Sequence, residues 1–332
     1  AGLSIVAANI TLGDDRTIME NQFLSPDETF DVIEPWCFNE TDTLREVVVG
    51  YAGNLYLNRD PDAQPDINNQ IQAKNAAAGN GPKREKSVEE LHNLARTLEQ
   101  NGITVYSPEA CSPDTGVINQ MYARDIGFVI GNTYFRASMS RPNRVNEWQS
   151  IAGIMRMMPE DRVKEVPRDV VVEGGDIVVD KGNVFVGISQ RTTREGFDYI
   201  STQASAQGLT AVPVHLRSLG EGADVLHLDC AFVPVGEDSA LIFEDGMTDV
   251  PREIRDMYDP IRVTADEQQD LATNVLAISP TGVVARHSAT RVNEEMTKRG
   301  IDVIGVQFDE APRAGGSLRC CTLPLARLGM VA

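Results

Sequence analysis

The sequence is poor in basic residues and has no long apolar run. Thirty lysines and arginines stand against 49 aspartates and glutamates, so the formal net charge is −19. A surface that negative repels phosphate backbones and anionic lipid headgroups, so we expect no nucleic-acid and no membrane partner. The charge favours the approach of a small cationic substrate, although solubility alone also explains it. No apolar run reaches the roughly 18 residues from which a membrane-spanning helix is inferred.

The sequence also lacks the cysteine patterns of a disulfide framework or a zinc site. Its five cysteines are irregularly spaced, with no CxxC pair and no Cys/His cluster: Cys37, Cys111, Cys230, Cys320 and Cys321. We therefore expect no disulfide framework, no metal and no other cofactor. The first residues, AGLSIVAANITLG, lack the basic and long apolar regions of a secretory signal. Together these absences favour a reducing, cytoplasmic location.

Three segments share one order of elements: an amphipathic helix, a glycine stop and a short β-branched strand. The glycine stops are Gly102, Gly208 and Gly300. They lie roughly 100 residues apart, which fits two units of about 50 residues in each interval. In the first segment, Ser87 and Glu90 have the spacing of a capping box at the start of the helix.

Paired strands lie between these helices, for example DIVVD with NVFVGI and VLAIS with GVVAR. The pattern predicts repeated ββαβ modules in an α/β fold. No linker divides the chain, so we expect a single catalytic domain over residues 1–332. Residues 59–86 are polar and rich in Pro, Gly and Asn, which predicts a surface insertion, either a plain loop or a lid over a site.

Two short motifs combine residues that are suited to catalysis. In AGGSLRCCTLPLAR, a glycine pair precedes Cys320, and Arg319 could help to hold a thiolate. A buried cysteine that serves as a small apolar residue is the alternative. In HLDCAF, strand alternation would place His227 and Asp229 on one face, as acid–base catalysis requires. A histidine that merely pairs with a surface carboxylate explains that motif equally well.

Two further motifs each place a carboxylate near the start of a predicted strand. Glu173 precedes two glycines in EGGDIVV, where a simple turn is the default explanation. Asp125 begins the strand in NQMYARDIGFVIG, with Asn119 and Tyr122 just before it. Each motif by itself is weak evidence for a catalytic site, and the order of the motifs along the chain is stronger evidence.

That order resembles the guanidino-group-modifying superfamily of arginine deiminases, dimethylarginine dimethylaminohydrolases and arginine amidinotransferases. The resemblance extends from about residue 38 to residue 330. It implies a five-bladed, pseudo-symmetric α/β propeller of ββαβ modules, known as the pentein fold, which agrees with the repeats above.

The resemblance also implies roles for individual residues. RCCTLPL is similar to the deiminase pattern RCMSMPL, which assigns the nucleophile to Cys320 and leaves Cys321 without a catalytic role. His227 takes the position of the acid–base residue. The carboxylates around the guanidinium are Glu173, Asp125 and Asp229. The substrate-binding positions are Asn119, Tyr122, Arg144 and Arg191, of which the two arginines would hold the substrate α-carboxylate.

This set of residues implies attack of a thiolate on the guanidinium carbon of arginine or a close analogue, through a covalent thiouronium intermediate. Arg191, Glu173 and Asp229 favour hydrolysis, and Asp229 suits a nitrogen that still carries hydrogens. NETDTLREVVVG and GNTYFRASMSRPNR instead resemble amidinotransferases. An inactive binding propeller and a homo-oligomer are further possibilities that the sequence leaves open.

Overall fold

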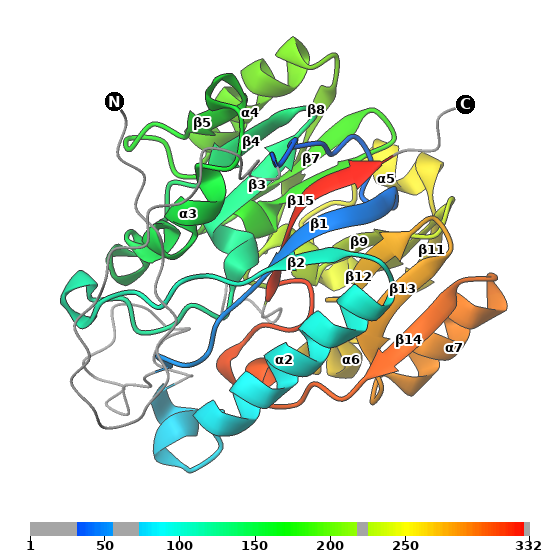
Figure 1. Cartoon of the computed structure of the whole chain (residues 1–332). Helices are drawn as coiled ribbons and strands as arrows, with labels where there is room; N and C mark the ends of the chain where they lie inside the picture. Colours follow the sequence, from blue (N-terminus) through cyan, green and yellow to red (C-terminus); the bar gives the residue numbers. More distant parts are fainter. Residues whose placement is uncertain (1–31, 56–72, 218–224, 329–332) are drawn as a thin grey trace, which may run out of the picture.

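The computed structural model describes residues 32–55, 73–217 and 225–328, and its elements are labelled in Figure 1. The described residues form five three-stranded sheets. In each sheet the central strand pairs antiparallel with one neighbour and parallel with the other. This is the predicted five-module α/β propeller.

The first three sheets follow one another along the chain, apart from β15. Their strands are β15 (Thr322–Leu328), β1 (Thr43–Val49) and β2 (Thr104–Tyr106); β3 (Gly127–Ile130), β4 (Thr133–Arg136) and β5 (Val163–Glu165); β6 (Ile177–Asp180), β7 (Asn183–Ile188) and β8 (Thr210–His215). The helices between their parallel strands are α2 (Arg84–Gln100), α3 (Ala152–Met155) and α4 (Arg194–Ala206).

The last two sheets repeat the same arrangement. Their strands are β9 (Phe232–Val235), β10 (Ser239–Ile242) and β11 (Asp259–Arg262); β12 (Leu276–Ser279), β13 (Gly282–Arg286) and β14 (Asp302–Val306). Their helices are α5 (Arg252–Met257) and α7 (Thr290–Lys298), with α6 (Ala265–Gln269) in the connection between the two sheets.

The ring of sheets closes where the two ends of the described chain meet. β15 pairs antiparallel with β1, with Val47 opposite Pro324, and β1 pairs parallel with β2. Figure 1 shows β15 in red beside β1 in blue. Because β15 supplies the buried edge strand of the sheet that contains β1 and β2, that sheet is complete only once the last described strand has been added.

The predicted glycine stops are confirmed. Gly102, Gly208 and Gly300 follow α2, α4 and α7 with φ values of 77°, 74° and 77°. A Cβ atom at any of the three would meet nothing within 4 Å. Glycine is therefore favoured there by the left-handed backbone rather than by lack of space.

The predicted capping box is wrong. α2 begins at Arg84, so Ser87 lies inside the helix and its Oγ donates to the Lys83 carbonyl at 3.0 Å. The Glu90 carboxylate instead accepts hydrogen bonds from the backbone N–H groups of Asp309, Glu310 and Ala311. Glu90 thus caps the 3₁₀ turn Ala311–Ala314 in another part of the chain.

The predicted insertion lies partly outside the described residues, which omit 56–72. In its remaining part, residues 73–77 are helical and residues 84–86 form the first turn of α2. A plain loop over residues 59–86 is therefore incorrect for these positions.

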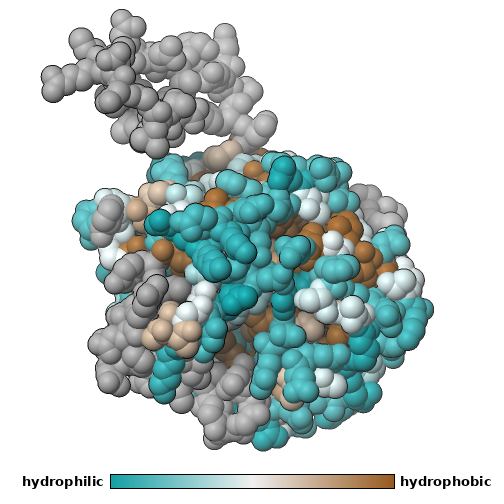
Figure 2. Space-filling view, turned by 90° about the horizontal axis from the view of Figure 1, so that it is seen from below, coloured by the Kyte–Doolittle hydropathy of each residue, from teal (hydrophilic) through white to brown (hydrophobic). Residues whose placement is uncertain are grey.

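Apolar side chains fill three clusters between the strands and helices, and strands such as β6 and β9 are buried along their whole length. The face seen in Figure 2 is mostly hydrophilic, with hydrophobic side chains scattered between the charged ones. Among the described residues, no helix has the length and apolarity needed to cross a bilayer.

Candidate functional site

The five predicted catalytic residues lie on or beside short turns just before the first strand of a sheet, whereas Arg144 and Arg191 follow β4 and β7. Three of the short turns are 3₁₀ turns: Ala123–Ile126 before β3, Gly174–Asp176 before β6 and Leu228–Cys230 before β9. The prediction that His227 and Asp229 alternate on a strand is therefore wrong, because β9 begins only at Phe232. Asp125 likewise precedes its strand instead of starting it.

Hydrogen bonds link these turns in series at the centre of the propeller. Arg124 N donates to the Cys320 carbonyl at 3.0 Å, and Leu228 N donates to Asp176 Oδ1 at 2.9 Å. Asn274 joins the two pairs, since its Oδ1 accepts from Cys320 N at 3.0 Å and its Nδ2 donates to the Asp229 carbonyl at 3.4 Å. The series connects the segments that lead into the first strands of all five sheets.

His227 is buried between two carboxylates. Its Nε2 lies 2.8 Å from Glu173 Oε2, and its Nδ1 lies 3.7 Å from Asp125 Oδ1. Burial lowers the pKa of His227, but the negative charge of Asp125 and the hydrogen bond to Glu173 outweigh burial and raise the pKa to about 10. The imidazole is therefore protonated at neutral pH and can donate a proton.

Glu173 is fully buried and accepts hydrogen bonds on both oxygens. Its Oε1 accepts from Ser140 N at 2.9 Å and from Ser140 Oγ at 2.6 Å, and its Oε2 faces His227 and Arg191 Nη1, the latter at 3.5 Å. Burial raises the pKa of Glu173, but the hydrogen bond and positive charge of His227 hold it well below its usual value. Glu173 therefore remains a carboxylate that orients the imidazole.

Arg144 is held by two acids in this structure. Its Nη1 donates to Asp125 Oδ2 at 2.7 Å, and its Nε and Nη2 form a bidentate pair with Glu147 at 2.9 and 2.8 Å. Burial raises the pKa of Glu147 to about 7 despite the charge of Arg144. All three guanidinium nitrogens of Arg144 thus have partners, and its role toward a substrate α-carboxylate stays a prediction.

Cys320 lies on the other side of this acidic centre, beside Asp229 and Cys230. Ligand atoms of these three residues all lie within 4.8 Å of one another, and Cys320 is 5% exposed. Cys321 has the opposite environment, because it is fully buried in the apolar cluster that contains Leu44 and Leu318. The two adjacent thiols therefore face different surroundings, and the assignment of the nucleophile to Cys320 stays a prediction.

The residue before Cys320, Arg319, is buried in a cluster of charged side chains. Arg319 Nε is 3.4 Å from Asp229 Oδ2, and Arg319 Nη1 pairs with Glu40, which also faces Arg327 and Arg124. Burial raises the pKa of Asp229, although the charge of Arg319 opposes that rise. Glu40 thus joins three buried guanidinium groups next to the segment that carries Cys320.

Several buried polar atoms at this centre have no hydrogen-bond partner among the described residues: Asp125 Oδ1, Asp229 Oδ2 and Arg191 Nε. A buried polar atom without a partner costs about 1–3 kcal/mol. Two of these atoms are acceptors on carboxylates and one is a guanidinium donor. A ligand with N–H donors at one end and an acceptor at the other would satisfy all three.

Two predicted substrate-binding residues make contacts of a different kind. Asn119 Oδ1 accepts from Met121 N at 2.9 Å, within its own loop. Tyr122 Oη donates to the Ala311 carbonyl at 3.0 Å, and its ring packs so closely on Gly316 that a Cβ there would lie 2.4 Å from it. Gly316 therefore admits the Tyr122 ring, and the roles of Asn119 and Tyr122 toward a ligand stay predictions.

The sequence analysis missed Glu147, Ser140, Asn274 and Cys230. Glu147 had a usable signal, because it stands three residues after Arg144 and an acid at that spacing often pairs with the arginine. Asn274 and Ser140 had none, since each acts on a residue far away in the chain.

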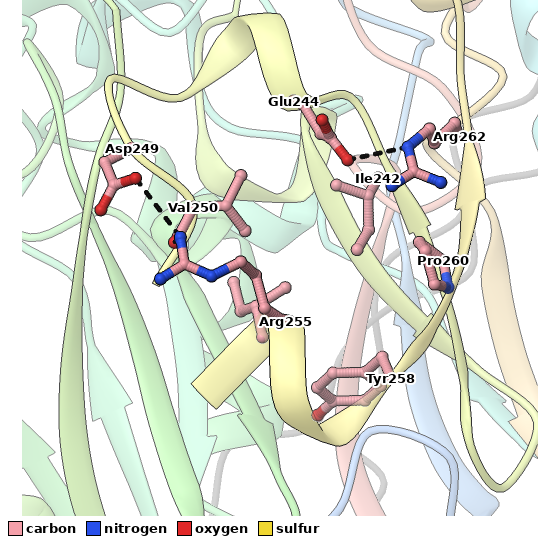
Figure 3. Close-up of a pocket in the computed structure, with 9 residues that line it drawn as sticks. Ile242, Glu244, Asp249, Val250, Arg255, Tyr258, Pro260 and Arg262 are labelled. Carbon is pink, nitrogen blue, oxygen red and sulfur yellow. Dashed lines mark hydrogen bonds and ion pairs between the residues drawn. The ribbon is translucent and has the colours of Figure 1, made fainter. Parts of the chain in front are cut away.

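A cavity of about 520 Å³ lies elsewhere, on the fourth sheet (Figure 3). Its charged lining residues are already paired, Glu244 with Arg262 at 3.0 Å and Asp249 with Arg255 at 3.4 Å. None of the predicted site residues lines it, so we do not assign the chemistry to this cavity.

Comparison with known proteins identifies the family. Residues 57–327 match the sequence family described as N,N dimethylarginine dimethylhydrolase, eukaryotic. The uncharacterized protein YkgA of Bacillus subtilis is 36% identical over 213 residues, which make up 64% of this chain and 71% of YkgA.

Solved structures of the same fold include enzymes with three different reactions. An inosamine-phosphate amidinotransferase from Streptomyces griseus superposes with a TM-score of 0.73 at 18% identity, covering 91% of this chain and 99% of that one. A dimethylarginine dimethylaminohydrolase from Pseudomonas aeruginosa in complex with citrulline gives 0.66 at 19% identity, covering 85% and 99%. The N-terminal domain of ArgZ, a cyanobacterial arginine dihydrolase, gives 0.68 at 18% identity, covering 86% and 98%. The chain belongs to the N,N-dimethylarginine dimethylhydrolase family of guanidino-group-modifying enzymes.

Proposed function

We propose that this protein hydrolyses the guanidino group of free arginine or a close analogue, with Cys320 as the nucleophile. One observation carries the proposal: Asp125 Oδ1 and Asp229 Oδ2 are buried carboxylate oxygens that make no hydrogen bond to a described residue and face only ion-pair partners, His227 Nδ1 at 3.7 Å and Arg319 Nε at 3.4 Å. A planar guanidinium offers several N–H donors in fixed directions, which suits carboxylate oxygens whose hydrogen-bonding capacity is unfilled.

The surrounding residues supply the remaining steps. With its charge held by the carboxylates, the guanidinium carbon is placed for attack by the Cys320 sulfur. The protonated imidazole of His227 gives its proton to the departing nitrogen as the C–N bond breaks, leaving a thiouronium on Cys320. The neutral imidazole then takes a proton from water, whose oxygen attacks the same carbon and releases Cys320.

The first leaving group decides the products. Loss of the terminal nitrogen gives ammonia and citrulline. Loss of the side-chain nitrogen gives ornithine, and complete hydrolysis of the remaining thiouronium by two waters then gives two ammonia and carbon dioxide. Asp229 supports a substrate nitrogen that carries hydrogens, because a methyl group cannot donate to Asp229 Oδ2, which makes no hydrogen bond to a described residue and faces only Arg319 Nε, at 3.4 Å.

Arg191 supports a substrate with an α-carboxylate. Its guanidinium is 2% exposed, one nitrogen faces Glu173, and Nε has no acceptor among the described residues. A carboxylate is the acceptor that arginine pairs with most strongly.

Transfer of the amidino group to an amine is the second candidate. The segment NETDTLREVVVG, which becomes β1, resembles the amidinotransferase opening, and an acceptor amine would replace water in the second step.

The test is a product analysis with the purified protein. Arginine and dimethylarginine are incubated separately, with and without glycine or lysine, and citrulline, ornithine, ammonia and dimethylamine are quantified. We expect citrulline or ornithine with ammonia from arginine alone. Ornithine that forms only when an amine is added would replace hydrolysis by transfer, and turnover of dimethylarginine alone would refute the argument from Asp229.

A further inference from the structure

Two buried thiols from different sheets meet at the site. Cys230 precedes β9 and Cys320 precedes β15, and both are free thiols. Their sulfur atoms lie within 4.8 Å of each other, and both lie within that distance of an oxygen of Asp229. We propose that Cys230 and Cys320 form a site of reversible oxidation, at which hydrogen peroxide converts the two thiols into a disulfide.

The backbones around the two cysteines are held by two adjacent residues, Thr273 and Asn274. Thr273 Oγ1 donates to the Cys230 carbonyl at 2.8 Å, and Asn274 Oδ1 accepts from Cys320 N at 3.0 Å. Asn274 Nδ2 also donates to the Asp229 carbonyl, next to Cys230. Neighbouring residues of one segment thus tie the two cysteine-bearing turns to each other, and a disulfide requires the sulfurs to move from within 4.8 Å to a bonding distance of about 2.05 Å.

The neighbouring thiol is not arranged in the same way. Cys321 follows Cys320 directly, but its side chain packs in the apolar cluster with Leu44 and Leu318. Cys230 is therefore the thiol that faces Cys320, even though 90 positions separate them along the sequence.

The oxidation proceeds in two steps. The Cys320 sulfur attacks one peroxide oxygen, the O–O bond breaks, and a sulfenic acid and water form. The Cys230 sulfur then attacks the Cys320 sulfur, the S–O bond breaks, and a second water leaves. Asp229 Oδ1, at 3.6 Å from Cys230 Sγ, is placed to carry the Cys230 proton to the leaving hydroxide.

The state of Cys230 agrees with this order of events. The hydrogen bond to Cys320, together with burial, raises the pKa of Cys230 well above its usual range. Cys230 therefore stays protonated at neutral pH and acts as the resolving thiol, while Cys320 is the sulfur that is oxidised first.

The consequence for activity rests on the proposed function. A nucleophile engaged in a disulfide cannot attack a substrate, so oxidation switches the enzyme off. The disulfide also protects Cys320 from the irreversible sulfinic acid, and a thiol reductant restores it.

The experiment uses the full protein treated with hydrogen peroxide, alkylated, digested without reductant and examined by mass spectrometry. We expect a linked peptide pair containing Cys230 and Cys320, with activity that returns after dithiothreitol. In Cys230→Ser, the linked pair is absent, Cys320 proceeds to sulfinic acid, and activity does not return. Cys321→Ser is the matched control and should form the Cys230–Cys320 link as the native protein does.

Two results would overturn the proposal. One is native Cys320 that reaches sulfinic acid as fast as in Cys230→Ser, with no linked peptides. The other is a link from Cys320 to Cys321 instead of Cys230. Because peptide mapping needs no turnover, a protein that forms the link but hydrolyses nothing would refute only the proposed hydrolysis.

Discussion

At the scale of single residues, His227 shows how charge can outweigh burial. A buried imidazole beside apolar groups loses its proton easily, yet Asp125 and Glu173 raise the pKa of His227 to about 10. The folded protein thus binds this proton more tightly than the unfolded chain does, in which a histidine has a pKa of about 6.5.

This difference predicts a dependence of stability on pH. The contribution of His227 to the free energy of unfolding is fully present below about pH 6.5 and is lost as the pH rises toward 10. We expect urea midpoints of the native protein to fall between pH 7 and 10 more steeply than those of His227→Gln. The exposed His287→Gln is the control and should follow the native curve; parallel curves for all three proteins would contradict the protonated state of His227.

Cys320→Ala tests which of the two adjacent thiols reacts. Loss of a nucleophile removes most of the rate, so we expect kcat to fall by about 10³-fold or more. Cys321→Ala removes a sulfur from an apolar cluster, which costs stability but leaves kcat largely intact. Steady-state kinetics on both variants decide the matter, and equal losses would mean that the assignment to Cys320 is wrong.

Arg191→Ala tests whether the Arg191 guanidinium, whose Nε has no acceptor among the described residues, binds the substrate. If Arg191 binds the α-carboxylate, KM for arginine should rise by about tenfold or more, equivalent to the 1.5–3 kcal/mol of a charged hydrogen bond. KM for agmatine, which lacks the carboxylate, should change much less. Equal changes for both compounds would rule out this contact.

At the scale of elements, one glutamate from α2 stabilises a turn more than 200 positions away in the chain. Glu90 accepts four hydrogen bonds from the backbone of residues 309–311, just ahead of the 3₁₀ turn that leads to the strand of Cys320. This contact holds the outer helix against the segment that enters the site.

Glu90→Gln should therefore weaken the fold. A neutral amide offers one acceptor oxygen in place of two charged ones, so we expect a loss of about 0.5–2 kcal/mol, as for other lost caps. Glu89→Gln, at the adjacent exposed position, is the control and should stay close to native in chemical denaturation. Equal midpoints for the two variants would show that the cap contributes nothing.

The elements also show where sequence reasoning succeeds. The helices that end at Gly102, Gly208 and Gly300 were predictable from the sequence. The helical spacing of apolar residues and the preference of glycine for a left-handed backbone both depend only on nearby residues. The false capping box arose because Glu90 has the right spacing to Ser87 but bonds to a distant turn. The strand expected at His227 fails for a similar reason, since a three-residue 3₁₀ turn before a strand shows no periodicity of its own.

The motif order named Cys320, His227, Glu173, Asp125 and Asp229 from the sequence, and their roles stay predictions. The structure places His227 against Glu173 and Asp125, and it places Cys320 beside Asp229. The pairing of Arg144 with Glu147 and the contact between Cys230 and Cys320 depend on how separate sheets meet, which no single segment encodes.

At the scale of the whole molecule, the net charge of −19 creates an attractive potential for cations. Salt screens such a field, with a Debye length of about 10 Å at 0.1 M. We expect KM for a cationic guanidino substrate to rise severalfold between low salt and about 0.5 M salt, with kcat unchanged. If KM does not change with salt concentration, solubility remains the explanation of the acidic composition.

The pairing of β15 with β1 determines when the site can become complete during protein synthesis. Cys320 stands two positions before β15, and β15 completes a sheet with β1 from the other end of the described chain. Of the described elements, this strand is the last to leave the ribosome. A nascent chain therefore carries Asp125, Glu173 and His227 long before it carries Cys320. If Cys320 is the nucleophile as proposed, the protein becomes able to react with a guanidine only after β15 has paired with β1.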